Sequence, residues 1–320
     1  MKRLFLSILV IVCAICSVVA QEREVVIACD WGDISATLNT PVEGSDVAVL
    51  IIAGSGPTDR NGNSGQGLNS YAYKMLSDDL VKGGVAVLRY DKRAIGRSPL
   101  NDPTTIPNLV FGDFVDDAVR CVDFLRSEGF SKIVVAGHSE GGEIALHLAL
   151  REDVTVDGLV LLCCPGFPMD KILSAQLSAQ LVPQHLGLML TATTLMQRIK
   201  AGEIVPVESM PQELLSLFHP SVQPFLCSSM AFDPAELMSR VEQPTLIISG
   251  GRDIQVTKEN AERLMARAKR GEYIHFEQMT HILKSADTSD RIEQLVSVYT
   301  NANLPLTEGV SEAVLGFVKR

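Results

Sequence analysis

The chain lacks an excess of positive charge, and this excludes one broad class of partners. Its 320 residues include 28 lysines and arginines against 38 aspartates and glutamates, which gives a formal net charge of −10. So acidic a protein is repelled by nucleic acid and by anionic membrane surfaces. We therefore expect neither of them as a partner.

The sequence also lacks the spacings that hold metals, phosphates or disulfides. Beyond residue 20 it contains no C-x-x-C pair, no histidine–carboxylate cluster at metal-ligand spacing and no phosphate-binding loop. An odd number of cysteines lies beyond residue 20, and we expect them to be small buried hydrophobic residues, with a disulfide permitted but not indicated. They are Cys29, Cys121, Cys163, Cys164 and Cys227. The expected protein has no metal and no organic cofactor.

The apolar run at the start of the chain is slightly too short to span a membrane. It covers Leu4–Val19, sixteen residues, whereas a span needs about 20. Met1-Lys2-Arg3 precede it, and Val18-Val19-Ala20 offer a small-residue cleavage site. These features are typical of a secretory signal peptide over residues 1–20, and a retained N-terminal anchor is the alternative. We therefore predict an exported bacterial protein, periplasmic or secreted, with no stable membrane association after cleavage.

Apolar β-rich runs alternate with helical patterns along most of the chain. The run Val47–Ala53 is continuous, as expected for a strand that is buried on both faces. Alternation of this kind predicts a doubly wound, mostly parallel sheet with helices on both faces. The expected strands are an antiparallel pair at 25–29 and 34–39, then 47–53, 85–90, 133–136, 158–162, 245–249 and 273–276, and the expected helices are 71–82, 113–128, 143–150 and 259–268.

One stretch breaks this alternation. Residues 167–240 contain no β-rich run, show a helical pattern punctuated by prolines, and hold six of the ten methionines. We interpret them as a helical lid inserted between two parts of the core, 21–166 and 241–320. The individual methionines are interpreted as packing in the insertion's own core rather than as the lining of an acyl pocket.

A glycine-rich turn carries the strongest chemical signal. Gly137-His138-Ser139-Glu140-Gly141-Gly142 follows a β-branched run and precedes a helical pattern. Strand, G-x-S-x-G and helix in that order are the signature of a nucleophile elbow. Gly137 and Gly141 are expected to be structurally required, because a Cβ at either position would clash with the neighbouring strand or helix. Ser139 is therefore the candidate nucleophile.

A base and an acid for Ser139 can be chosen by their position in the chain. Of six histidines only His281 follows the last expected strand, on the loop where a base would meet the elbow. His138 adjoins Ser139 and is expected to point away from it. Asp253, just after the strand at 245–249, completes the order Ser, Asp, His. Asp287 and Asp290 are competitors, but they follow the histidine and are expected to cap a helix.

Two backbone N–H groups are candidates for stabilising a developing oxyanion. One belongs to Glu140, at the N-terminus of the helix after the elbow. The other belongs to Ser55, in the glycine-rich loop Gly54–Asn63 that follows the strand at 47–53. In that loop Asp59 and Arg60 could pair with each other, or Arg60 could meet a substrate carboxylate; we favour a structural role.

Together these motifs resemble the α/β-hydrolase superfamily, specifically bacterial exported serine esterases and related serine aminopeptidase-like hydrolases. The resemblance runs from about Val25 to the C-terminus. It implies an α/β-hydrolase fold, with Ser139 as nucleophile, His281 as base and Asp253 as acid. It is carried by Gly54-Ser55-Gly56-Pro57 with Asp59-Arg60, by Arg89–Ser98, by Gly137–Gly142, by Gly251-x-Asp253 and by His281.

The chain departs from the family pattern at two positions. Ala53 occupies the place before the oxyanion glycine where a histidine often braces the loop. Ala94 stands at the first glycine of the pattern Asp-x-Arg-Gly-x-Gly-x-Ser, and there we expect only an altered turn.

The sequence thus predicts a serine carboxylesterase that acts on a small-molecule ester. A serine peptidase with the same triad is the alternative, and it would want an acidic anchor such as Glu208 or Glu213. A non-catalytic binding module on a hydrolase scaffold is the third reading. The sequence leaves the acyl and alcohol specificity and the oligomeric state open.

Overall fold

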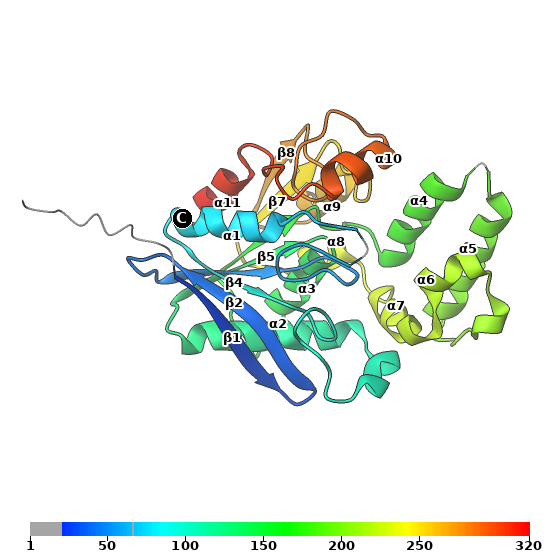
Figure 1. Cartoon of the computed structure of the whole chain (residues 1–320), viewed down its shortest axis with the longest axis horizontal. Coiled ribbons are helices and arrows are strands. Elements are labelled where there is room, and N and C mark those ends of the chain that lie inside the picture. Colours follow the sequence, from blue (N-terminus) through cyan, green and yellow to red (C-terminus); the bar gives the residue numbers. More distant parts are fainter. Residues whose placement is uncertain (1–20, 66, 183) are drawn as a thin grey trace, which may run out of the picture.

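An eight-stranded sheet organises the molecule. The computed structural model describes residues 21–65, 67–182 and 184–320, so the predicted signal peptide lies outside the described residues. The strand order is β1-β2-β4-β3-β5-β6-β7-β8 (Figure 1). β1 and β2 pair with each other and β2 pairs with β4 antiparallel, whereas all later pairs are parallel. The expected fold class and the opening antiparallel pair are both confirmed.

The central strands coincide with apolar, β-branched runs of the sequence, because central parallel strands are buried on both faces. Every residue of β4, β6 and β7 is buried. The strands are β1 Gln21–Cys29, β2 Gly32–Thr40, β3 Val47–Ile52, β4 Ala86–Tyr90, β5 Lys132–His138, β6 Gly158–Leu162, β7 Thr245–Gly250 and β8 Gly271–Phe276.

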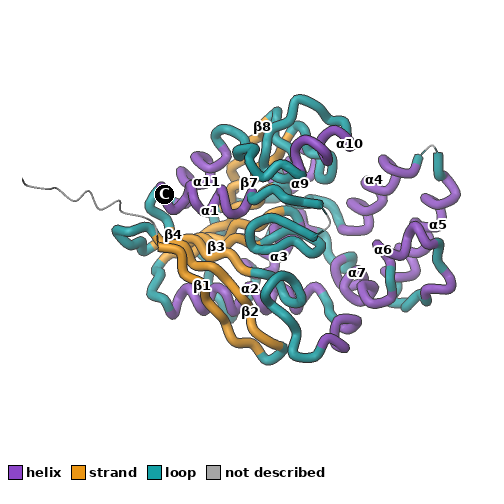
Figure 2. The backbone as a smooth tube through the Cα atoms, viewed as in Figure 1, coloured by secondary structure: helices purple, strands orange, loops and turns teal. Residues whose placement is uncertain are grey.

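Helices cover both faces of this sheet (Figure 2). α1 (Ala72–Lys82) and α11 (Val310–Val318) pack on one face, where Leu76, Leu80 and Val314 join the strand residues in one core. α2 (Phe111–Ser127), α3 (Glu140–Ala149), α8 (Pro234–Met238) and α9 (Lys258–Met265) pack on the other face and share the second core. The sheet is therefore sandwiched between two apolar layers.

The segment between β6 and β7 is helical and projects to one side of the sheet (Figure 1). α4 (Met169–Leu181), α5 (Leu186–Lys200), α6 (Leu215–Phe218) and α7 (Gln223–Ser229) surround a hydrophobic cluster of their own. Met169, Met196 and Met230 are buried in that cluster, as the sequence interpretation expected. Met238, on α8, instead joins the core of the sheet.

Several details differ from the sequence expectations. α2 begins at Phe111 rather than at 113, and α9 ends at Met265 rather than at 268. The C-terminal helix α11, the short α10 (Arg291–Gln294) and the π-helical turn Leu295–Tyr299 were not expected. α11 is short and apolar, so its periodicity is weak, and its place is fixed by packing against α1.

The cysteines fulfil most of what was expected of them. All five described cysteines are free thiols, and Cys121, Cys163 and Cys164 are buried. Cys29 and Cys227 are only half-buried, so the description as buried hydrophobes is wrong for these two. Among the described residues no helix has the length and apolar character needed to cross a bilayer.

Candidate functional site

Ser139 occupies the strained turn between β5 and α3. Its φ of 52° and ψ of −124° lie outside the regions that non-glycine residues ordinarily adopt. The flanking glycines permit the turn: a Cβ on Gly137 would lie 2.1 Å from the Gly141 carbonyl oxygen, and one on Gly141 would lie 2.3 Å from the Ile52 carbonyl oxygen. The backbone therefore holds Ser139 at the carboxyl end of the sheet.

Asp253 and His281 meet where the loops after β7 and β8 pack together. Asp253 Oδ1 accepts hydrogen bonds from the N–H groups of Gln255 and Val256, both at 2.8 Å. Its Oδ2 lies 2.8 Å from His281 Nδ1. One carboxylate oxygen thus anchors the turn while the other orients the imidazole.

This pairing fixes the tautomer of His281. A carboxylate oxygen only accepts, so Nδ1 carries the proton and, in the neutral ring, Nε2 is an acceptor. Ser139 and His281 line the same small cavity. The competitor Asp290 instead caps α10, where it accepts the Glu293 N–H at 2.8 Å. The arrangement can therefore pass a proton from a serine hydroxyl to an oriented imidazole.

The two residues that carry the expected oxyanion donors both lie near Ser139. Glu140 begins α3, and Ser55 lies in the loop after β3; both line the same large cavity as Ser139. Within the described part of the chain no group accepts a hydrogen bond from the N–H of Ser55 or of Glu140. Both donors are thus available to an oxygen atom placed beside Ser139.

His138 lies beside the candidate site, which corrects the expectation that it points away. It lines the same small cavity as Ser139, and its ring centroid is 4.8 Å from that of His281. Its Nε2 lies 2.7 Å from the His281 carbonyl oxygen, which can only accept, so Nε2 carries the proton. Its Nδ1 therefore accepts from the Tyr73 hydroxyl at 2.7 Å. His138 thus holds the backbone of His281 in place.

The other four histidines lie elsewhere. His147 packs against Phe111 and Phe232, and His275 is hydrogen-bonded to Ser249. His185 is exposed and His219 bonds Ser221 on the surface.

Acidification below about pH 6.5 is expected to destabilise the fold through His138. Burial, helped by the nearby His281, lowers the pKa of His138 to about 3, whereas the unfolded chain protonates near 6.5. The stability that neutral His138 contributes above pH 6.5 is then lost as the pH falls. The free energy of unfolding should decrease by about 2 kcal/mol between pH 7 and pH 5. Urea unfolding at both pH values should show a smaller loss in His138→Asn than in the wild type.

His147 serves as the matched comparison for this experiment. Burial also lowers its pKa, to about 4, so His147→Asn should remove a similar share of the pH dependence from a position remote from Ser139. An unchanged loss in His138→Asn would contradict the assignment of a neutral His138.

One group of side chains in the described region has donor atoms close enough for a metal. His138, Cys163 and His281 offer ligand atoms within 4.8 Å of one another. Both ring nitrogens of His138 and the Nδ1 of His281 are already hydrogen-bonded, and burial raises the pKa of the Cys163 thiol well above its ordinary value. A metal would have to displace these contacts, so the group fits the hydrogen-bonded site better than a metal centre. The absence of a metal remains a prediction.

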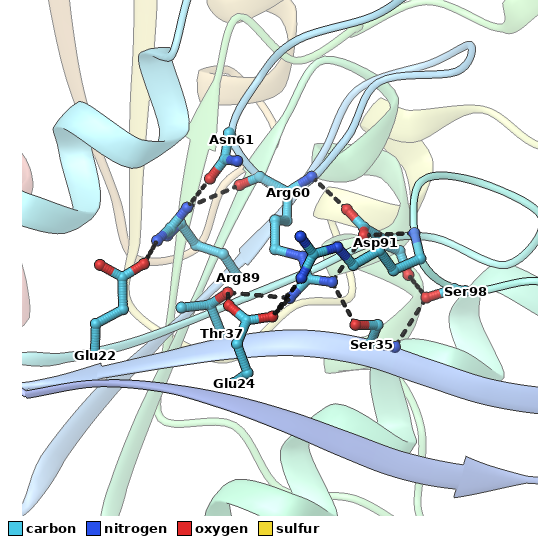
Figure 3. Close-up of polar contacts among 10 residues, drawn as sticks. Glu22, Glu24, Ser35, Thr37, Arg60, Asn61, Arg89, Asp91 and Ser98 are labelled. Atoms are coloured by element: carbon cyan, nitrogen blue, oxygen red, sulfur yellow. Dashed lines mark hydrogen bonds and ion pairs between the residues drawn. The ribbon is translucent and has the colours of Figure 1, made fainter.

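Arg60 has the structural role that the sequence favoured, with a different partner. It is buried, and its guanidinium pairs with Asp91 at 2.8 Å and with Glu24 at 3.0 Å (Figure 3). Asp91 also accepts the Arg60 backbone N–H at 2.8 Å. Asp59, the partner expected, instead accepts the N–H groups of Asn61 and Asn63 within its own turn. The loop after β3 is thus fastened to the end of β4.

Two cavities meet at Ser139, since Ser55, Ser139 and Gln255 line both. The smaller, about 110 Å³, is lined by His281, Tyr73 and Tyr299 among others. The larger, about 470 Å³, runs beneath the helical insertion. Its apolar lining includes Ile95, Leu109, Phe114, Met169, Leu173 and Phe225. Among the insertion's methionines only Met169 reaches it.

The charges that line the larger cavity are paired with each other or with neighbours. Arg93 is held by Asp117 at 2.7 Å and by Asp113 at 3.2 Å. Lys92 pairs with Glu140 at 3.3 Å. The cavity therefore favours an uncharged occupant, because a charged one would have to break one of these pairs.

Comparison with known proteins places this site in context. Residues 63–285 match the family described as Serine aminopeptidase, S33. Esterase EstD from Thermotoga maritima is 28% identical over 247 residues, which make up 75% of this chain and 55% of that protein. The chain thus spans about half the length of this curated relative.

Solved structures share the architecture at low identity. Est1E from Butyrivibrio proteoclasticus, solved with bound ferulic acid, has a TM-score of 0.58 and 18% identity, covering 92% of this chain and 100% of that one. Proline iminopeptidase from Mycobacterium smegmatis has a TM-score of 0.57 and 16% identity, covering 93% and 98%. At these identities the likeness is one of fold.

Proposed function

Because the chain belongs to the serine aminopeptidase S33 family of α/β-hydrolases, we propose that it is an exported serine hydrolase that cleaves carboxylic esters. The observation that carries the proposal is the position of Ser139 at the junction of two cavities, beside the Asp253–His281 pair. An ester has an acyl part and an alcohol part. When the nucleophile lies between two pockets, each pocket can bind one of these parts. The reaction needs no cofactor.

The proposed reaction proceeds through an acyl-enzyme. Ser139 Oγ attacks the ester carbonyl carbon while His281 Nε2 takes its proton, and the N–H groups of Ser55 and Glu140 hold the oxyanion. The carbon–oxygen bond to the alcohol then breaks as His281 returns the proton to the leaving oxygen. A water molecule then attacks the acyl-enzyme through the same steps, which releases the acid and regenerates Ser139. Asp253 keeps His281 in the required tautomer throughout.

The two arms of the ester can be assigned to the two cavities. His281 must protonate the leaving alcohol, and among the two cavities it lines the smaller one. The acyl arm then extends into the larger apolar cavity, beside Glu140 and beneath α4 and α7, for which we propose the role of a lid. We infer a substrate with a medium-length or aromatic uncharged acyl group and a small alcohol.

The linings of the cavities favour an ester over a peptide. A peptidase that trims amino termini needs a free carboxylate for the substrate ammonium group. Glu208 and Glu213, the anchors suggested by the sequence, are exposed and line neither cavity. Glu140, the one carboxylate among the described lining residues, is paired with Lys92.

Two isomeric esters test this assignment. Methyl octanoate and heptyl acetate have the same formula, but only the first places its long chain on the acyl side. We expect kcat/KM to be at least about 10-fold higher for methyl octanoate. The long chain of heptyl acetate lies on the alcohol side, where several of its methylene groups would stay unburied, and burial contributes roughly 0.8 kcal/mol for each methylene group. Titration of released acid gives both rates.

An aminoacyl p-nitroanilide completes the panel. Turnover of the anilide with no turnover of either ester would overturn the esterase proposal in favour of the peptidase. A preference for heptyl acetate would leave the esterase proposal intact and reverse the assignment of the cavities.

Export is proposed on the sequence of the first twenty residues. Lys2 and Arg3 followed by the apolar run Leu4–Val19 support a secretory signal. Expression of the full chain in a bacterium, followed by N-terminal sequencing of the extracytoplasmic product, should give Gln21 as the first residue. An uncleaved, membrane-bound product would favour the anchor.

A further inference from the structure

Lys92 is a buried lysine outside the proposed triad, and it occupies the first variable position of the pattern Asp-x-Arg-Gly-x-Gly-x-Ser. It lies two residues after the end of β4, and its side chain is only 3% exposed. Its Nζ donates to the Gly54 carbonyl oxygen at 2.5 Å and lies 3.3 Å from Glu140 Oε1. Burial of an ammonium group is costly unless it is paired and hydrogen-bonded, so both contacts are needed to hold it there.

The contact with Gly54 has a consequence for Ser55. The Gly54 carbonyl and the Ser55 N–H belong to one peptide unit, which is planar and trans, so the two bonds point in opposite directions. A cation that fixes the carbonyl therefore also aims the N–H to the opposite side. That N–H is one of the two proposed oxyanion donors.

Gly54 is held from its other side as well. Its N–H donates to the Tyr73 hydroxyl at 3.1 Å, and that hydroxyl in turn donates to His138. A Cβ on Gly54 would lie 3.2 Å from the Ser139 Cβ, so the loop rests directly on the elbow. With both of its polar groups bonded, Gly54 has little freedom to rotate the following peptide.

Lys92 also connects the two donors to each other. The side chain of Glu140 accepts a hydrogen bond from the Lys92 ammonium, while the backbone N–H of Glu140 is the second proposed oxyanion donor. The positive charge of Lys92, next to the Gly54 carbonyl oxygen, polarises the peptide between Gly54 and Ser55. This polarisation strengthens the Ser55 N–H as a hydrogen-bond donor. The charge thus lies where it reinforces the site for a negative oxygen.

The turn that presents Lys92 is itself shaped by the second departure from the family pattern. Ala94 adopts a left-handed φ of 64°, so this turn keeps the glycine-like backbone without the glycine. The Ile95 N–H donates to the Lys92 carbonyl oxygen at 3.0 Å and closes the turn. Ala94 therefore lies in a strained turn that begins at Lys92.

We propose that Lys92 is the positioning residue of the oxyanion site, in place of the histidine that the family resemblance leads one to expect at Ala53. It orients and polarises the peptide between Gly54 and Ser55, and it couples that peptide to Glu140. The proposal rests on the proposed esterase function. Lys92 touches no reacting atom and acts through the two backbone donors.

The test compares Lys92→Met with the neutral pair Lys92→Met/Glu140→Gln and with Lys132→Met. Lys132 is a matched control, since its Nζ also donates to a backbone carbonyl, that of Val318, but from the start of β5 rather than from a strand's carboxyl end. For each protein one measures kcat and KM on methyl octanoate, the inhibition constant of butylboronic acid, and the melting temperature. Butylboronic acid is used because its serine adduct is tetrahedral and carries the oxyanion.

We expect Lys92→Met to lower kcat by roughly 10²- to 10³-fold with KM changed less than about 3-fold, as for loss of an oxyanion donor. Binding of butylboronic acid should weaken by a comparable factor. The double variant should melt near the wild type, because no unpaired buried charge remains, yet keep the low kcat. Lys132→Met should keep the wild-type kcat.

The alternative outcomes separate the two proposals. Recovery of kcat in the double variant, or wild-type kcat in Lys92→Met, would overturn the role of Lys92 and leave a purely structural ion pair. Absence of ester turnover in the wild type would instead overturn the proposed function.

Discussion

Ser139→Ala is expected to lower ester turnover by roughly 10⁵- to 10⁶-fold, the size of loss that follows removal of a serine nucleophile. The variant retains the Cβ, so it can adopt the same φ of 52° and leave the elbow in place. The bound ester would still meet the two backbone donors, but no acyl-enzyme can form. The measurement is turnover of methyl octanoate together with covalent labelling by a fluorophosphonate.

Ser77→Ala provides the matched control for this experiment. Ser77 is a fully buried serine on α1 whose hydroxyl has no partner among the described residues. Its removal should leave both labelling and turnover at the wild-type level. Labelling of Ser139→Ala as strong as that of the wild type would exclude Ser139 as the nucleophile, and absent labelling of the wild type would favour the non-catalytic binding module.

Asp253→Asn is expected to lower kcat by roughly 10³- to 10⁴-fold while preserving the fold. The amide oxygen can still accept the N–H groups of Gln255 and Val256, so the turn remains intact. The amide NH₂ then faces His281 and donates to Nδ1. The imidazole is forced to carry its proton on Nε2, where it can no longer accept one from Ser139.

Asp290→Asn is the comparison that isolates this effect. Asp290 competes with Asp253 on sequence grounds, but in the fold it caps α10. Asparagine caps helices about as well as aspartate, so stability and kcat should stay close to the wild type. Steady-state kinetics and thermal melting of both variants give the answer, and equal losses of kcat in the two would count against Asp253 as the partner of His281.

The features of the site that could be predicted are those formed by residues close together in the chain. The elbow is a local feature, because strand, strained serine and helix are contiguous. Gly137 and Gly141 indicate it in the sequence. The chain order placed Asp253 and His281 on loops that had to reach the same edge of the sheet, and there the structure brings them to 2.8 Å.

The parts that sequence reasoning missed all depend on contacts between distant elements. The Tyr73 hydroxyl, on α1, accepts the Gly54 N–H, and Lys92, just after β4, donates to the Gly54 carbonyl oxygen. His138, at the end of β5, donates to the His281 carbonyl oxygen. The run Arg89–Ser98 carries a family motif, and a lysine two residues after a buried strand was the one available signal for Lys92. Its partner could not be read from spacing.

The sequence by itself determined the strands, most of the helices, the turn at Ser139 and the order of the candidate residues. These follow from local physics: β-branched runs, helical periodicity and the backbone freedom of glycine. Only the tertiary structure decided which side chain braces the loop at Ser55, that two cavities meet at Ser139, and that the charges along the larger one are paired. Those outcomes depend on how buried groups from separate elements satisfy one another, and the free energy of burying a charge or a hydrogen-bond donor is settled by its neighbours in space rather than along the chain.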